Sequence, residues 1–296
     1  MELLMTGATG LTGGLFLQRL AQVTPQAKVH CLVRSTSDRS AINTLNLNLI
    51  YHFGDTSNSE TWEKSFSQNT WDTILHLAQL RQIPTILHSL KNADNTPRLI
   101  IIGTTGVYSK YNQYSAEYKE AEAQLAKYPG SYCLLRPTMI YGSHQDKNLH
   151  KLIKFCYRYG FFPIFGSGNN LVQPIHADDI AKALLYVLQH PNIQGDYDIS
   201  GASIVSLREL LVLVEKQLGK PVRPITLPLN VGMWSATILE SILGKRAPVR
   251  REQILRLEED KDYPHDAAQR DLDFFPRTLE IGLQQEVELM RHKGII

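Results

Sequence analysis

The sequence predicts an α/β protein: a Rossmann-type, doubly wound parallel sheet with a smaller, mostly helical C-terminal substrate lobe. Three observations support this prediction. A glycine-rich turn follows the first apolar run, short apolar runs then alternate with helical stretches up to about Pro137, and the rest of the chain is mostly helical. Such alternation is typical of a parallel sheet with helices on both faces.

The first elements form a β-α-β unit. A strand from Leu3 to Met5 runs into the turn Thr6-Gly7-Ala8-Thr9-Gly10-Leu11-Thr12-Gly13, and a second strand is expected from Lys28 to Val33. The helix between them has apolar side chains at helical spacing: Leu15, Phe16, Leu17, Leu20 and Val23. In this setting, glycines let a pyrophosphate approach the backbone and rest on free N–H groups at the helix start. The turn therefore predicts a dinucleotide site.

Four further strands are predicted by length and composition: Leu49 to Phe53, Thr73 to Ala78, Leu99 to Gly103 and Tyr132 to Arg136. After Pro137 we expect a turn from Pro163 to Asn170 and the following helices: about Lys147 to Tyr159, Ile180 to Gln189, Leu207 to Leu218, Leu229 to Leu243 and Leu279 to Met290. We assign residues 1–165 to the dinucleotide-binding domain and 166–296 to the substrate lobe, with sheet elements shared between them. The ligand crevice is expected at the carboxyl ends of the strands.

Composition excludes several classes of partner. The net charge is +2 with both signs spread along the chain, which argues against nucleic acid and against a polybasic membrane patch. No apolar run approaches the roughly 18 residues of a membrane span, and the glycine motif leaves no room for a signal peptide before it. Cys31, Cys133 and Cys156 are far apart, as in a reduced compartment. We expect a cytoplasmic protein with a small-molecule substrate and no metal; a homodimer is left open.

Further motifs follow the turn in a fixed order: Gly54-Asp55, His76-Leu77-Ala78, Leu135-Arg136-Pro137-Thr138-Met139-Ile140-Tyr141-Gly142 and Pro174-Ile175-His176-Ala177-Asp178-Asp179-Ile180-Ala181. With them, nearly the whole chain resembles an extended short-chain dehydrogenase/reductase of the NAD-dependent epimerase/dehydratase type. The resemblance implies a cofactor site made of Gly7, Thr9, Gly10, Leu11 and Gly13 at the pyrophosphate, Asp55 at the adenine, and Leu77, Ala78 and Pro137 beside the cofactor.

The end of the second strand bears on cofactor choice. Members of the family that prefer NAD carry an acid there for the ribose 2′-hydroxyl, whereas this chain has Arg34 and Ser35, which suit a 2′-phosphate. We therefore predict NADP, with NAD as the less favoured cofactor. The alternative is that Arg34 is a solvated loop arginine.

The catalytic residues depart from the family pattern. The resemblance implies a Ser/Thr, matched by Thr104, and a Tyr-x-x-x-Lys pair, which this chain lacks. Alignment puts Tyr114 at the tyrosine position and Tyr118 at the lysine position, with Lys119 one residue later, about 100° around a helix. Lys119 could serve only if the helix is shifted; otherwise Tyr114 lacks its usual activator.

Two other departures concern the substrate. The segments from Ala78 to Leu99 and from Thr104 to Tyr114 are shorter than in typical extended members, and Val172 stands where sugar-nucleotide enzymes of the family carry an arginine. This combination resembles the atypical branch of the superfamily, which includes NmrA-like regulators and an accessory subunit of respiratory complex I.

Two functional hypotheses follow. The first is an NADP-preferring oxidoreductase or epimerase acting on a carbonyl or secondary alcohol of a small polar metabolite, with a sugar derivative as the first candidate. The second is a non-catalytic NAD(P)-binding regulator or assembly factor, NmrA-like or similar to the complex I subunit. The missing Tyr-x-x-x-Lys pair supports the second.

Overall fold

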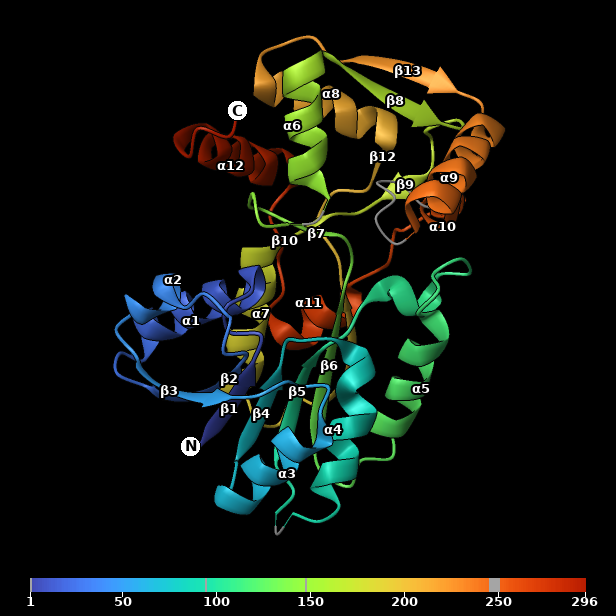
Figure 1. Cartoon of the computed structure of the whole chain (residues 1–296). Coiled ribbons are helices and arrows are strands. Elements are labelled where there is room, and N and C mark those ends of the chain that lie inside the picture. The colour runs from blue at the N-terminus through green and yellow to red at the C-terminus, as the bar shows by residue number, and fades with distance from the viewer. Residues whose placement is uncertain (1, 94, 147, 245–250) are drawn as a thin grey trace.

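The computed structural model describes residues 2–93, 95–146, 148–244 and 251–296. Its centre is a parallel seven-stranded sheet in the order β11-β6-β5-β4-β1-β2-β3, which confirms the predicted fold class (Figure 1). The strands are β1 (Leu3–Thr6), β2 (Lys28–Val33), β3 (Asn48–Phe53), β4 (Thr73–His76), β5 (Arg98–Ile102), β6 (Tyr132–Pro137) and β11 (Gly195–Ile199).

Helices cover both faces of this sheet because successive strand side chains point to opposite faces. Leu3 and Met5 of β1 pack with one group of helices: α1 (Leu11–Val23), α2 (Ser40–Asn43), α7 (Ala177–Gln189) and α11 (Asp266–Leu272). Leu4 packs with the other: α3 (Ser59–Gln68), α4 (Ile83–Leu90) and α5 (Ser115–Leu125). Two short 3-10 helices, η1 (Leu80–Gln82) and η2 (Thr105–Tyr108), follow β4 and β5.

A second, smaller region lies beyond the carboxyl ends of the strands, at the top of Figure 1. Its helices are α6 (Leu149–Tyr159), α8 (Leu207–Leu218), α9 (Leu229–Leu243), α10 (Arg251–Leu255), η4 (Arg256–Glu258) and α12 (Leu279–His292). Its short strands are β7 (Ile140–Tyr141), β8 (Phe161–Phe165), β9 (Leu171–Val172), β10 (Ile175–His176), β12 (Val205–Ser206) and β13 (Arg223–Leu227). We call this region the lobe; it has a hydrophobic core of its own. Within the described residues, no helix is long and apolar enough to cross a membrane.

Two predictions about secondary structure need correction. The predicted turn from Pro163 to Asn170 begins instead inside β8, where Pro163 lies opposite Ile225 of β13. A proline is tolerated there because the two-stranded sheet consists only of edge strands. The sequence did not predict β11, the strand that completes the sheet beside β6. Lys147, the expected start of α6, lies outside the described residues.

An ion-pair network joins the lobe to the sheet at the start of α7. Asp178 receives hydrogen bonds from Arg19 of α1 at 2.6 and 2.7 Å and from Arg277, which precedes α12, at 2.6 Å. Arg277 also binds Asp179 at 2.8 Å. Burial opposes the charge of Asp178, but the bonds from the two arginines outweigh it and lower the pKa of this carboxyl to about 2.

A buried acid lies in the lobe core. Glu286 of α12 is fully buried; its Oε2 accepts a bond from the Gly142 N–H at 3.2 Å, and its Oε1 has no hydrogen-bond partner among the described residues. Burial, and then the neighbouring Asp146 carboxyl group, raise the pKa of Glu286 from 4.5 to about 10. The folded protein therefore holds a proton here that the unfolded chain loses above about pH 4.5.

Glu286→Gln tests this proton. Since the folded pKa is raised, wild-type stability falls as pH rises between 4.5 and 10, whereas glutamine carries no such cost. We expect the variant to gain stability relative to the wild type by up to about 1.4 kcal/mol per pH unit over this range, measured by urea unfolding at pH 5, 7 and 9. Glu288→Gln, at an exposed position of the same helix, is the control. A difference that does not change with pH would contradict the assignment.

Candidate functional site

The glycine-rich turn is shaped by close backbone contacts. A Cβ at Gly13 would lie 2.1 Å from the Gly7 carbonyl oxygen, so α1 can approach β1 only with glycine there. Gly7 has φ +73°, and a Cβ on it would lie 3.0 Å from the Leu77 carbonyl. Gly10 precedes α1 without a side-chain cap, and the first turn of the helix has no acidic residue. The start of α1 is thus built to accept an anion, which fits a dinucleotide pyrophosphate.

The other predicted cofactor residues follow strands of the same parallel sheet. Thr9 lies in the turn after β1 and Leu11 begins α1. The others lie at the ends of the neighbouring strands: Arg34 and Ser35 after β2, Asp55 after β3, Leu77 and Ala78 after β4, and Pro137 at the end of β6. Because the strands are parallel, their carboxyl ends share one edge, and the structure gathers these residues along it. That edge faces the lobe (Figure 1).

The arginine loop after β2 borders Asp55. Arg34 is exposed. Bonds from the Ser57 N–H and hydroxyl, and then the charge of Arg34, lower the pKa of Asp55. The nearby Arg39 has its guanidinium 5.0 Å from the ring centroids of both Tyr51 and Phe53 on β3. Of the two arginines in this loop, Arg39 is thus stacked on rings of β3, whereas Arg34 is exposed beside Asp55.

The last residue of β4, His76, is buried and hydrogen-bonded on both ring nitrogens. His76 Nδ1 lies 3.0 Å from the Thr6 hydroxyl, and its Nε2 lies 3.2 Å from the Gln79 carbonyl oxygen. Burial lowers the pKa of His76 to about 4, so the ring is neutral at pH 7. His76 thus ties the last residue of β4 to the last residue of β1.

Thr104 follows β5 and caps η2. Its hydroxyl oxygen accepts the Gly106 N–H at 3.0 Å, which uses a lone pair and leaves the hydroxyl proton to be donated elsewhere. The neighbouring Thr105 is buried and donates to the Pro137 carbonyl oxygen at 3.3 Å. The Thr105 hydroxyl proton is thus used within the protein, whereas the Thr104 hydroxyl acts as an acceptor in its bond with the Gly106 N–H.

Tyr114 directly precedes α5, and the first turn of the helix is regular. The Tyr118 N–H donates to the Tyr114 carbonyl oxygen at 3.0 Å, and the two rings are 6.3 Å apart. Tyr118 therefore occupies the position one turn after Tyr114, and Lys119 is exposed.

A different cation lies beside Tyr114. The Arg81 guanidinium of η1 is 4.4 Å from the Tyr114 ring centroid, and its Nε donates to Gln79 Oε1 at 2.6 Å. Sequence reasoning missed Arg81. The short segment after Ala78 was the available signal, because it keeps Arg81 close to the end of β4.

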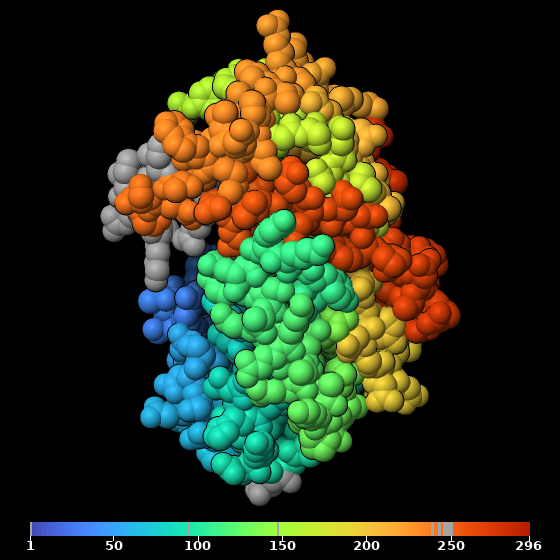
Figure 2. All heavy atoms as spheres, turned by 90° about the vertical axis from the view of Figure 1, so that its right-hand side faces the viewer, coloured from blue at the N-terminus to red at the C-terminus, as the bar shows by residue number. Residues whose placement is uncertain are grey.

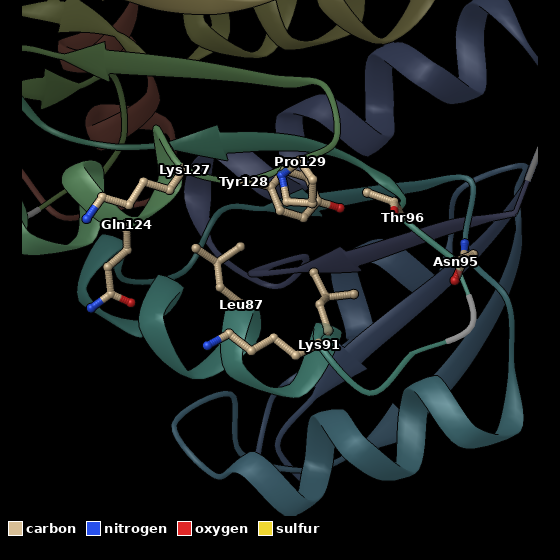
Figure 3. A pocket seen from close by; sticks show the side chains of 9 residues that line it. Leu87, Lys91, Asn95, Thr96, Gln124, Lys127, Tyr128 and Pro129 are labelled. Carbon is tan, nitrogen blue, oxygen red and sulfur yellow. The ribbon is translucent and has the colours of Figure 1, made fainter.

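A surface hollow of about 450 Å³ lies elsewhere (Figure 3). It is bounded by Leu87 and Lys91 near the end of α4, by Thr96 before β5, and by Tyr128 and Pro129 before β6. These residues precede the strands, so the hollow is at the opposite edge of the sheet from the glycine-rich turn. The candidate site therefore rests on the strand ends, and not on this hollow.

A family model and several curated proteins match parts of this chain. The model of the NAD dependent epimerase/dehydratase family matches residues 3–200. A mitochondrial NADH dehydrogenase (ubiquinone) 1 alpha subcomplex subunit 9 from Arabidopsis thaliana is 24% identical over 54% of this chain and 42% of its own length. An N-acetyl-alpha-D-glucosaminyl-diphospho-ditrans,octacis-undecaprenol 4-epimerase from Escherichia coli O157:H7 is 25% identical over 48% of this chain and 46% of its own. The chain spans about half the length of these curated relatives.

Solved structures share the fold. The UDP-glucose 4-epimerase of Thermotoga maritima, crystallised with UDP-glucose, superposes with a TM-score of 0.76 at 18% identity, covering 99% of each chain. The UDP-glucose 4-epimerase of Bifidobacterium longum, in complex with NAD+ and UDP, gives 0.75 at 16% identity, covering 100% of this chain and 99% of the other.

Gly10→Asp tests the anion cradle. The carboxylate would stand where the structure leaves the start of α1 open to a phosphate, so we expect dinucleotide affinity to fall by about a hundredfold in calorimetric titration. Gly10→Ala is the matched control: its Cβ would lie 3.3 Å from the Gly7 oxygen at an ordinary φ of −79° and adds no charge. Unchanged affinity in the aspartate variant would refute the cradle.

Proposed function

The chain belongs to the NAD dependent epimerase/dehydratase family, and from this membership we propose that it is an oxidoreductase or epimerase that uses a nicotinamide dinucleotide on a carbonyl or secondary alcohol. The observation that carries the proposal is the uncapped start of α1 after β1, together with Thr104 directly after β5 and Tyr114 directly before α5. Anion binding alone would need only the first of these three features.

The cofactor would be held along the strand ends. Its pyrophosphate would rest on the turn of Gly7, Gly10 and Gly13, and its adenosine half would lie toward Arg34 and Asp55. The bound nicotinamide supplies or accepts the hydride. Arg34, exposed after β2, favours NADP over NAD in this proposal.

Two side chains would handle the proton and the substrate oxygen. The Thr104 hydroxyl, whose oxygen already accepts the Gly106 N–H, would donate its proton to a carbonyl oxygen of the substrate. The Tyr114 phenol would give or take the proton while hydride moves. The Arg81 guanidinium is stacked on the Tyr114 ring, 4.4 Å from its centroid, and would help to hold the phenol in one orientation.

The substrate proposed is a small polar metabolite, with a sugar derivative as the first candidate. Epimerases of sugar derivatives among the similar proteins and solved structures support it. Val172, where sugar-nucleotide enzymes of the family carry an arginine, argues for a substrate other than an ordinary nucleotide sugar.

A second candidate function is a non-catalytic NAD(P)-binding regulator or assembly factor. Two observations favour it: Tyr118 and not a lysine follows Tyr114 by one turn, and similar proteins include subunits of mitochondrial NADH dehydrogenase. Loss of NADPH absorbance with a panel of carbonyl compounds supports the enzyme, whereas tight binding without turnover supports the regulator.

Tyr114→Phe tests the proton donor. Removing one general acid/base costs about a hundredfold or more in rate, so we expect turnover to fall by at least this factor while the dinucleotide still binds. Tyr159→Phe, at an exposed position on α6, is the control. A variant that turns over at the wild-type rate would eliminate Tyr114 and direct attention to Tyr108, Tyr111 or Lys119.

Arg34→Ala tests cofactor preference. A charge-assisted contact with phosphate is worth about 1.5 to 3 kcal/mol, so we expect NADPH to lose tenfold or more in affinity while NADH changes little. Arg39→Ala, in the same loop but stacked on the rings of β3, should weaken the two cofactors equally. Equal losses for both cofactors in Arg34→Ala would show that Arg34 does not read the 2′-phosphate.

A further inference from the structure

A single carboxylate of the lobe reaches the segment that links η2 to α5, residues 109–114, which we call the 109–114 loop. Glu259 directly follows η4, about 150 positions further along the chain. Its Oε2 accepts the Ser109 hydroxyl at 2.7 Å, and its Oε1 accepts the N–H groups of Lys110 at 2.7 Å and Tyr111 at 3.4 Å. Figure 2 shows the two parts of the chain meeting, the teal-green start of α5 beneath the orange-red segment near residue 260.

The hydrogen bonds continue from Ser109 to Tyr114. The Ser109 hydroxyl oxygen accepts the Asn112 N–H at 3.0 Å, and Asn112 Oδ1 accepts the Tyr114 N–H at 3.1 Å. Each bond fixes one more residue of the loop. The backbone of Tyr114 is therefore connected to the lobe through Asn112 and Ser109.

The same asparagine also reaches the threonine. Asn112 Nδ2 donates to the Gly106 carbonyl oxygen at 3.3 Å, and the Gly106 N–H donates to the Thr104 hydroxyl oxygen. Asn112 thus bridges the two candidate catalytic residues, and Glu259 holds the loop that carries Asn112.

The two acidic residues next to Glu259 in the sequence, Glu258 and Asp260, form hydrogen bonds with residues of the lobe. Asp260 Oδ1 accepts the Leu171 N–H of β9 at 2.8 Å. Glu258 is exposed, and its backbone carbonyl accepts a bond from Asn170. Bonds to a carboxylate are about twice as strong as bonds between neutral groups, so three donors on Glu259 make a firm attachment.

We propose that Glu259 is a positioning residue: the lobe sets Tyr114 and Thr104 in place through the path Glu259–Ser109–Asn112. Its catalytic meaning rests on the proposed function, whereas its effect on the loop does not. The candidate site is then complete only when the lobe is docked on the sheet. A substrate bound between the lobe and the sheet would therefore strengthen or weaken the contact of Glu259 with the 109–114 loop.

Hydrogen exchange tests the attachment without any substrate. In Glu259→Ala the bonds from the Lys110 and Tyr111 N–H groups are lost, so we expect the amide exchange rate across residues 105–118 to rise about tenfold or more. The exchange rate in β2, which Glu259 does not contact, should stay unchanged. Glu258→Ala is the matched control and should leave this segment as in the wild type. Wild-type exchange in Glu259→Ala would overturn the proposal.

Steady-state kinetics test the positioning. We expect kcat of Glu259→Ala to fall by about a hundredfold with KM for the dinucleotide unchanged, since the turn of Gly7, Gly10 and Gly13 is untouched. Glu259→Gln should recover most of kcat because its amide oxygen can still accept the two N–H groups. A loop that loosens without a loss of kcat, or a glutamine variant as impaired as alanine, would overturn the positioning role. If the wild type itself shows no turnover, the proposed function fails, and the exchange result still decides the attachment.

Discussion

The close approach of α1 to β1 is the constraint on which the candidate site depends. Gly13 lies so near Gly7 that a Cβ would overlap its carbonyl oxygen, and Gly7 in turn lies against the Leu77 carbonyl at the end of β4. These contacts bring the helix start to the edge of the sheet and join the turn to the neighbouring strand. Parallel strand direction then brings the residues after β2, β3, β4 and β5 to the same edge. The side chains of those residues determine which ligand this edge of the sheet can bind and which reaction it can support.

The site is completed by contacts between distant segments. Arg81 brings a cation to Tyr114 from the end of β4, and Glu259 holds the 109–114 loop from the lobe. The network of Asp178 and Arg277 fixes the lobe on the sheet independently of the loop. A cation therefore lies on the face of the Tyr114 ring although the lysine of the family pattern is missing, and the same arginine pairs with Glu117 at 3.5 Å.

Sequence predicted those parts of the fold that have a strong local signal. The apolar runs of β1 to β6 read as buried strands because both faces of a parallel sheet are covered. β11 was not predicted because it contains two acids, Asp196 and Asp198. Arg136 of the neighbouring β6 forms ion pairs with them, at 2.6 and 3.8 Å, and the local sequence does not reveal a partner on another strand. Thr104 and Tyr114 could be named from their motifs, but Arg81 and Glu259 act through tertiary contacts. The domain boundary at residue 165, the cytoplasmic location and the choice of NADP stay predictions.

The central claim is that the strand ends bind a nicotinamide dinucleotide with its reactive ring beside Thr104 and Tyr114. A crystal structure of the protein with NADPH tests it most directly. The account predicts the diphosphate on the N–H groups at the start of α1, the 2′-phosphate beside Arg34, and the nicotinamide between Leu77 and Tyr114. A dinucleotide bound elsewhere, or one whose nicotinamide points away from Tyr114, would contradict the account.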